Sequence, residues 1–153
     1  MTQMDEFDRK ILQLVQVDNL MPQREISERV GLSAPAVARR LQRLRMTGVI
    51  KRDISVVNEG ALGRPLTIIV EVATENERLD LIDEMKRRFV SCPQVQQCYY
   101  VTGETDFILV MNTRDMDEYT SLTRQLFFKG GNVKSFRTCV AMEKVKTDGP
   151  VPL

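Results

Sequence analysis

The sequence predicts an α+β protein with two parts, and three observations support this prediction. Apolar residues at helical spacing dominate the first third of the chain, which includes a short turn between two helices. A linker rich in glycine follows at residues 58–65. Beyond it, strand and helix patterns follow one another in the order β-α-β-β-α-β, which is typical of a ferredoxin-like antiparallel sheet with both helices on one face.

The composition argues against several classes of protein. The chain has 153 residues, of which 42% are hydrophobic and 28% charged, as expected for one ordinary or two small globular domains. It has no histidine, nucleophile elbow or P-loop, so we expect no enzyme, no metal site and no cofactor. Cys92, Cys98 and Cys139 lack paired spacing and are interpreted as free thiols. Without a signal peptide or a long apolar run, we expect a cytoplasmic protein and no membrane partner.

Residues 1–57 are predicted to form a winged helix-turn-helix domain. An amphipathic helix is expected at residues 5–17, and a second helix ends near Gly31, which supplies a left-handed C-terminal residue. Ser33 is the expected N-cap of a third helix, and a turn this short is the helix-turn-helix signature. The alternating residues 49–57 are predicted to form a strand and a wing.

The third helix has two chemically different faces. Val37, Leu41 and Leu44 form a buried stripe, and arginines lie across from it. Between Gly31 and Arg52 there are six basic residues and no acidic one. Surface helices usually interleave both signs, so this segment favours DNA binding over ordinary solvated charge. We expect the following residues to contact DNA, the last two through phosphates: Ser33, Pro35, Ala36, Arg39, Arg40, Arg43, Lys51 and Arg52.

Residues 66–147 are predicted to form the ferredoxin-like domain, followed by a tail at 148–153. Several of its strands are apolar on both sides, as at Ile68 and Ile69, so the sheet face without helices is expected to bind a second copy of the chain. A twofold dimer would present two recognition helices to a roughly palindromic site on double-stranded DNA. The strands are expected at 66–73, 94–102, 106–112 and 134–143, and the helices at 76–89 and 115–127.

Four short segments occur together in this order: Ile26-Ser-Glu-Arg-Val-Gly-Leu-Ser33, Gly48-Val-Ile50, Val101-Thr-Gly-Glu-Thr-Asp-Phe107 and Met142-Glu-Lys-Val-Lys146. On these segments the chain resembles the Lrp/AsnC family over about residues 4–147. The resemblance implies a sequence-specific transcription regulator, a homodimer that assembles further into octamers, and an amino-acid effector bound between dimers. Gly130-Gly-Asn-Val133 departs from the leucine-proline-glycine-valine turn of many relatives, near the expected assembly surface.

The turn from Thr102 to Asp106 has two interpretations. Turn chemistry explains it fully, since Gly103 supplies a positive φ and Asp106 bonds the turn backbone. Alternatively, backbone groups beside Gly103 bind the carboxylate of an amino acid while Asp106 accepts from its ammonium, and the resemblance favours this second interpretation. The resemblance implies an effector site made of Tyr100, Thr102, Gly103, Glu104, Thr105, Asp106, Phe128, Cys139, Val140 and Ala141. The last four of these residues have another interpretation, in which they pack in the core at a subunit interface.

Two other functions are compatible with these patterns. A metabolite sensor or an enzyme on a ferredoxin-like fold would fit the second domain, although no convergent set of acids and bases is visible. A nucleoid-type architectural DNA-binding protein with a vestigial effector pocket would fit the first domain. Turnover of an amino acid would support the enzyme, and indifference of DNA binding to all amino acids would support the architectural protein.

Overall fold

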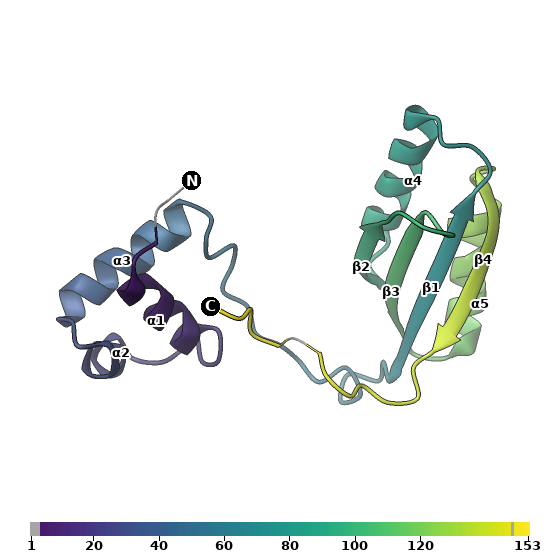
Figure 1. The fold of residues 1–153 in the computed structure, drawn as a ribbon. Coiled ribbons are helices and arrows are strands. Elements are labelled where there is room, and N and C mark those ends of the chain that lie inside the picture. The colour runs from purple at the N-terminus through teal and green to yellow at the C-terminus, as the bar shows by residue number, and fades with distance from the viewer. Residues whose placement is uncertain (1–3, 148) are drawn as a thin grey trace. The chain divides into compact units, whose positions relative to one another are not determined.

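The helices and strands fall into two compact units. The computed structural model describes residues 4–147 and 149–153. Of these, residues up to 56 and those after 144 form one unit, here called the helical unit, and residues 57–144 form the sheet unit. Figure 1 shows a group of helices in the first and a sheet lined by helices in the second.

The helical unit is built around a helix-turn-helix. The Gly31 backbone adopts φ 73°, and its N–H and that of Leu32 donate to the Ser27 carbonyl at 3.0 and 3.1 Å, which closes the second helix. The Ser33 hydroxyl accepts from the Ala36 N–H at 3.4 Å and begins the third. This confirms the predicted helix-turn-helix. Its helices are α1 (Glu6–Val15), α2 (Gln23–Val30) and α3 (Ala34–Met46), around a core of Ile11, Ile26, Val30, Val37 and Leu41.

The segment after α3 differs from the prediction. Residues 47–65 are all described and contain no strand, so the wing strand predicted at 49–57 does not form in this chain by itself. Alternating residues favour a strand, but a strand needs a neighbour for its backbone groups. An ion pair of 2.9 Å from Arg45 Nε to Asp53 Oδ2 instead ties this segment to α3.

The last residues of the chain belong to the helical unit. The Gln16 side-chain amide donates to the Val151 carbonyl at 3.2 Å and accepts from the Val151 N–H at 2.7 Å. Gln13 Nε2 donates to the Leu153 carbonyl at 3.4 Å. Val151 and Leu153 thus line a groove of about 840 Å³, whose other walls include residues 15–20 and 49–56.

The sheet unit has the predicted ferredoxin-like topology. Its four strands pair antiparallel in the order β2-β3-β1-β4, so the first strand lies between the third and the last. The helix predicted at 115–127 ends in a turn of π-helix, and the one predicted from residue 76 begins later. The elements are β1 (Leu66–Thr74), α4 (Leu79–Ser91), β2 (Val95–Tyr100), β3 (Phe107–Thr113), α5 (Met116–Thr123), the π-helix η1 (Arg124–Phe128) and β4 (Val133–Val140).

Both long helices cover the same face of this sheet (Figure 1). Ile68 and Val70 of β1 have no exposed surface and pack beneath them. Phe89 of α4 lies at the centre of this core, with its ring edge-on to Phe107 at 5.3 Å and to Phe127 at 6.1 Å. Burial on alternate residues explains why the strand pattern could be read from the sequence.

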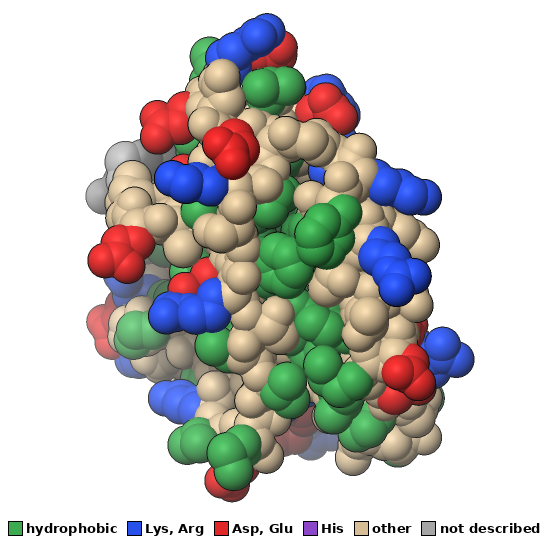
Figure 2. All heavy atoms as spheres, turned by 90° about the vertical axis from the view of Figure 1, so that its right-hand side faces the viewer, with side chains coloured by type: hydrophobic (Ala, Val, Ile, Leu, Met, Phe, Trp, Pro, Cys, Tyr) green, Lys and Arg blue, Asp and Glu red, His purple; other side chains and the backbone are tan. Residues whose placement is uncertain are grey.

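The opposite face of the sheet is partly apolar. The pairing register places Glu71 beside Ile108, and Ile108 beside Tyr99, which is 51% exposed. Ile69, in the next row, is 37% exposed, and Arg137 pairs with Glu71 across the face. A second apolar surface lies on the side of the sheet unit that carries β4 and α5, where Figure 2 shows hydrophobic side chains gathered along the middle. The sheet unit therefore exposes apolar surface of the kind that proteins usually cover.

The turn before β4 is held by a buried amide. Asn132 is 4% exposed, and its side chain accepts from the Asn76 N–H and donates to the Asn76 carbonyl, both at 3.0 Å. The Asn76 side chain in turn accepts from the Arg78 N–H at 2.9 Å. These bonds keep Asn76 outside the helix, so α4 begins at Leu79. Asn132, which follows Gly131 (φ 69°) in the turn, thus has a structural role in this chain.

Candidate DNA interface and effector loop

The solvent-facing side of α3 is a narrow stripe along the helix. Pro35, Arg39, Gln42 and Met46 are spaced three or four residues apart, which places them on one side, and all four are exposed. Met46 is 79% exposed. Gln42 was not predicted from the sequence, although its position on the stripe could have identified it. Its amide has the geometry to pair with an adenine edge.

Two of the predicted arginines lie beside this stripe and bind α1. Arg40 Nη1 lies 2.7 Å from Asp5 Oδ2 and 2.8 Å from Asp8 Oδ1, and Arg43 Nη2 also pairs with Asp8. The Asp8 side chain has no exposed surface, whereas those of Arg40 and Arg43 are 22% and 43% exposed. Helical periodicity gives the direction of a side chain but not the partner it meets on another helix. Arg39 therefore faces solvent, while Arg40 lies largely in a contact between helices.

Asp5 and Asp8 also begin α1. The Asp8 N–H donates to Asp5 Oδ1 at 2.8 Å, and the Asp5 N–H donates to Asp8 Oδ2 at 3.1 Å, which is a reciprocal capping box. The Asp8 backbone N–H and the Arg40 guanidinium lower the pKa of the Asp5 carboxyl. Both carboxylates thus connect the beginning of α1 to the arginines of α3.

The other predicted DNA contacts lie at the beginning and beyond the end of α3. Ser33 is exposed and Ala36 is half-buried in the first turn of the helix. Lys51 and Arg52 are exposed on the irregular segment that replaces the predicted wing. The small side chains at the leading end of α3 leave its backbone accessible, as a helix that enters a DNA groove requires.

The loop between β2 and β3 contains the predicted effector residues. Thr102, Gly103 and Glu104 are exposed, and Gly103 has φ 135°, a conformation that favours glycine. Asp106 is half-buried, and its Oδ2 accepts from the N–H of Thr74 at 2.7 Å and from its hydroxyl at 2.8 Å. Asp106 thus ties the loop to the end of β1. Among the described residues, no hydrogen-bond donor reaches its other oxygen, Oδ1.

Two predicted effector residues are aromatic side chains with exposed surface. Tyr100 is 53% exposed, and its ring centroid lies 5.1 Å from that of Phe107 and 4.9 Å from Lys86 Nζ. Phe128 is 68% exposed, and its ring meets Phe136 edge-on at 5.8 Å. Each ring is held on one side by the sheet unit and is open on the other.

The remaining predicted effector residues do not meet the loop within one chain. Cys139 pairs with Ile69 in the sheet register, whereas the loop enters β3 at Phe107, which pairs with Val72. The two places are three residues apart along β1, about 10 Å at the usual rise of a strand. Val140 and Ala141 follow Cys139 and lie farther away still. Within one chain, these residues therefore lie apart from the loop.

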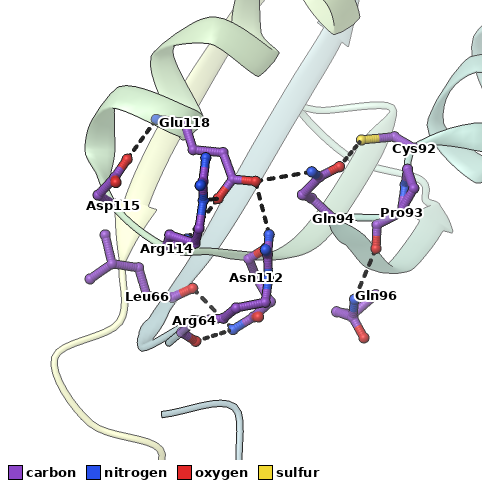
Figure 3. Close-up of polar contacts among 10 residues, drawn as sticks. All are labelled: Arg64, Leu66, Cys92, Pro93, Gln94, Gln96, Asn112, Arg114, Asp115 and Glu118. Atoms are coloured by element: carbon purple, nitrogen blue, oxygen red, sulfur yellow. Dashed lines mark hydrogen bonds and ion pairs between the residues drawn. The ribbon is translucent and has the colours of Figure 1, made fainter. Parts of the chain in front are cut away.

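A polar network around Glu118 was not predicted from the sequence (Figure 3). The Glu118 carboxylate accepts from the Arg114 N–H at 2.8 Å, from Arg64 Nη2 at 2.9 Å and from Gln94 Nε2 at 3.0 Å. The Arg114 N–H is the largest cause that lowers the pKa of Glu118 to about 2, followed by Gln94 and Arg64. The Asn112 amide donates to the Arg64 carbonyl at 2.8 Å. This network fixes the end of the linker to the sheet unit, and the polar Asn112 within the apolar β3 run was its only signal in the sequence.

Two further features are absent from the described part of the chain, a metal-binding cluster and a membrane-spanning helix. Within residues 4–147 and 149–153, histidine, cysteine and acidic side chains form no cluster of three that could hold a metal ion. No helix among these residues has the length and apolar character needed to cross a membrane.

Comparison with known proteins identifies both halves of the chain. Residues 4–45 match the model of the AsnC-type helix-turn-helix domain, and residues 67–151 match that of the Lrp/AsnC ligand binding domain. An uncharacterized HTH-type transcriptional regulator of Sinorhizobium fredii is 42% identical over 151 residues, which cover 99% of this chain and 89% of that protein. The leucine-responsive regulatory protein of Escherichia coli is 30% identical over 143 residues, covering 94% of this chain and 87% of that protein.

Solved structures share this fold over nearly the whole chain. An AsnC family transcriptional regulator from Agrobacterium tumefaciens superposes with a TM-score of 0.91 at 25% identity, over 97% of both chains. A transcriptional regulator from Neisseria meningitidis in complex with L-methionine superposes with a TM-score of 0.91 at 24% identity, over 98% of this chain and 97% of that one. With both domains matched in the same order, the chain belongs to the Lrp/AsnC family of transcriptional regulators.

Proposed function

We propose that this regulator binds a roughly palindromic site on double-stranded DNA through α3, and that an amino acid bound to the sheet unit changes its assembly. The observation that carries the proposal is the exposed stripe of α3 around Arg39. It lies in a segment of six basic residues and no acidic one that begins at the helix-turn-helix. The presence of a ligand-binding domain in the same family supports the second half of the proposal.

The proposed DNA contacts divide by their chemistry. Arg39 and Gln42 read base edges in the major groove, where arginine pairs with guanine and glutamine with adenine. Arg43 lies at the border of the stripe and reaches a phosphate or base edge with the nitrogens that do not bind Asp8. Ser33, Pro35 and Ala36 bring the first turn of α3 close to the DNA backbone, and Lys51, Arg52 and Arg40 add phosphate contacts.

Replacing Arg39 by alanine should weaken binding to a selected site by about 1–3 kcal/mol and relax the base preference at one position. Replacing Lys51 by alanine should weaken binding to all DNA sequences alike. It should also make the affinity depend less steeply on salt concentration, since a phosphate contact releases counterions without reading sequence. Competition between a selected duplex and a mixed-sequence duplex, measured at several salt concentrations, separates these effects. An Arg39→Ala protein with unchanged sequence preference would remove Arg39 from the interface.

The proposed effector is an amino acid bound at the loop from Thr102 to Asp106. Exposed backbone groups beside Gly103 would bind its carboxylate, and Asp106 Oδ1 would accept from its ammonium. Tyr100 and Phe128 offer apolar surface for its side chain. One structural neighbour binds L-methionine and one relative is named as leucine-responsive, so we expect an apolar amino acid.

The proposed assembly is a homodimer formed through the open face of the sheet, with dimers joined further into octamers. Ile69 and Tyr99, which are exposed on that face, support a contact between two copies there. Cys139, Val140 and Ala141 would then reach the effector loop of a neighbouring chain, because they lie too far from the loop of their own. A ligand that touches two chains binds one assembly better than another, which is what a change of assembly requires. Sedimentation as a 17.6 kDa monomer at micromolar concentration would contradict this assembly.

Replacing Asp106 by asparagine tests the effector site. The bonds from Thr74 to Asp106 are also compatible with a purely structural role for Asp106. In that case the chain would fit an architectural DNA-binding protein that has no effector. In a thermal-shift panel of the twenty amino acids, wild type should gain melting temperature with at least one of them. Asp106→Asn should lose that gain while it keeps effector-free DNA binding and sedimentation. A panel without any shift would favour the architectural protein, and an unchanged shift in the variant would leave Asp106 as a turn residue.

A further inference from the structure

We draw a further inference from Asp5 and Asp8, the acidic residues at the beginning of α1, and it rests on the proposed DNA binding. Asp5 and Asp8 contribute two negative charges to a cluster in which Arg40 and Arg43 contribute two positive charges, so the cluster is formally neutral. The acids come from a different helix, more than thirty residues earlier in the chain. Their pairing therefore reflects the packing of the three helices and not an ordinary interleaving of charge along α3.

The cations of this region fall into two groups. Arg40, Arg43 and Arg45 each bind a carboxylate of the helical unit. Within the described residues, no carboxylate lies in ion-pairing range of Arg39, Lys51 or Arg52. The first group therefore has little long-range attraction for phosphate, while the second keeps its full charge. Sequence-independent affinity follows the number of phosphates that unpaired cations neutralise.

The paired arginines are held in place. Arg40 donates from the single atom Nη1 to oxygens of both Asp5 and Asp8, and its guanidinium carbon lies 5.6 Å from the centre of the Phe7 ring. Arg43 donates to Asp8 from Nη2, and its side chain is 43% exposed. Each guanidinium has five N–H donors in a rigid fork, so donors remain for a phosphate or a base in a fixed direction. Pairing thus removes net charge but leaves directional hydrogen bonding.

We propose that Asp5 and Asp8 are specificity-determining residues of the DNA interface, because they neutralise Arg40 and Arg43 and thereby lower affinity for DNA of any sequence. Coulombic attraction acts at every site on DNA, whereas directed hydrogen bonds act only where a base or phosphate lies in the right place. Neutralising two arginines weakens the Coulombic attraction to any DNA but preserves the directed hydrogen bonds. The ratio of specific to non-specific affinity rises as a result.

Replacing Asp5 by asparagine in the full chain tests this inference. Asn is as good an N-cap as Asp, so the bond from the Asp8 N–H and the beginning of α1 are kept while one negative charge is lost. The variant should bind a mixed-sequence duplex about tenfold more tightly at 0.1 M salt, with a slope of log affinity against log salt that is steeper by about 0.9. Its preference for a duplex that the wild type selects from a random pool should fall. Asp5→Ser, another capping side chain, should behave in the same way.

Asp117→Asn is the matched control. Asp117 is an exposed acid in the first turn of α5, so its replacement makes the same change of charge in the sheet unit. The inference is overturned if Asp5→Asn and Asp117→Asn give the same salt slope, or if Asp5→Asn leaves the preference for the selected duplex unchanged. If wild type binds neither duplex at any salt concentration, the proposed DNA binding itself fails, and the inference fails with it.

Discussion

Replacing both Arg40 and Arg43 by alanine should lower the free energy of unfolding of the helical unit by about 3–5 kcal/mol, because it leaves the Asp8 carboxylate buried without a cation. The Asp8 side chain has no exposed surface, and the two guanidinium groups supply the positive charge that compensates its carboxylate. A unit of this size rarely has more than about 3–5 kcal/mol of stability in total. We therefore expect the double variant to show an early unfolding transition of the helical unit in urea, followed by that of the sheet unit.

Adding Asp8→Leu to the double variant is the control for this prediction. Replacing a buried ion pair by an apolar side chain of similar volume is often neutral, so the triple variant should recover most of the lost stability. A double variant as stable as wild type would show that Asp8 does not depend on the two arginines. The consequence for DNA binding is practical: replacing Arg40 and Arg43 together combines unfolding with the loss of two proposed DNA contacts, whereas Arg39→Ala leaves this ion cluster intact.

Replacing Glu118 by glutamine should destabilise the sheet unit by about 1.5–3 kcal/mol near neutral pH, the usual range for hydrogen bonds to a charged group. The folded-state pKa of Glu118 is about 2, below its ordinary value of 4.5. A group whose pKa is lowered by folding contributes stability above its unfolded pKa, and this contribution is lost as the pH falls through the folded pKa. The difference between wild type and Glu118→Gln should therefore be constant above about pH 5 and should shrink toward zero as the pH falls to about 2.

Urea unfolding of the two proteins between pH 7 and pH 2.5 measures this difference directly. Glu77→Gln is a suitable control, since Glu77 is an exposed carboxylate of the same unit. It should change stability little at any pH. A difference between wild type and Glu118→Gln that does not vary with pH would mean that the bonds from Arg114, Arg64 and Gln94 do not depend on the charge of Glu118.

Local patterns were sufficient to predict the fold. The helix-turn-helix follows from Gly31 and Ser33, whose backbone roles depend only on their immediate neighbours. The order of strands and helices in the sheet unit follows from alternating burial, as in Ile68 and Val70. Residues 49–57 show the limit of this reasoning, because they alternate like a strand but have no neighbouring strand in the described chain.

The side-chain contacts of the sites depended on tertiary structure and could not be predicted. Nothing around Arg40 in the sequence shows that its partner is Asp8, because the two meet only when α1 packs on α3. The Glu118 network joins Arg64 of the linker, Gln94 just before β2, and Glu118 of α5. Asp106 was predicted either to bond the turn backbone or to bind an effector, whereas its observed bonds come from Thr74 at the end of β1, a partner that turn chemistry does not predict.

The contact between Gln16 and Val151 means that the chain leaves the helical unit through one segment and returns to it through another. The intact chain therefore gives residues 149–153 a higher concentration near Gln16 than they would have as a separate peptide. Cutting the chain between the sheet unit and residue 149 would lower that concentration to the bulk concentration of the protein and weaken the contact.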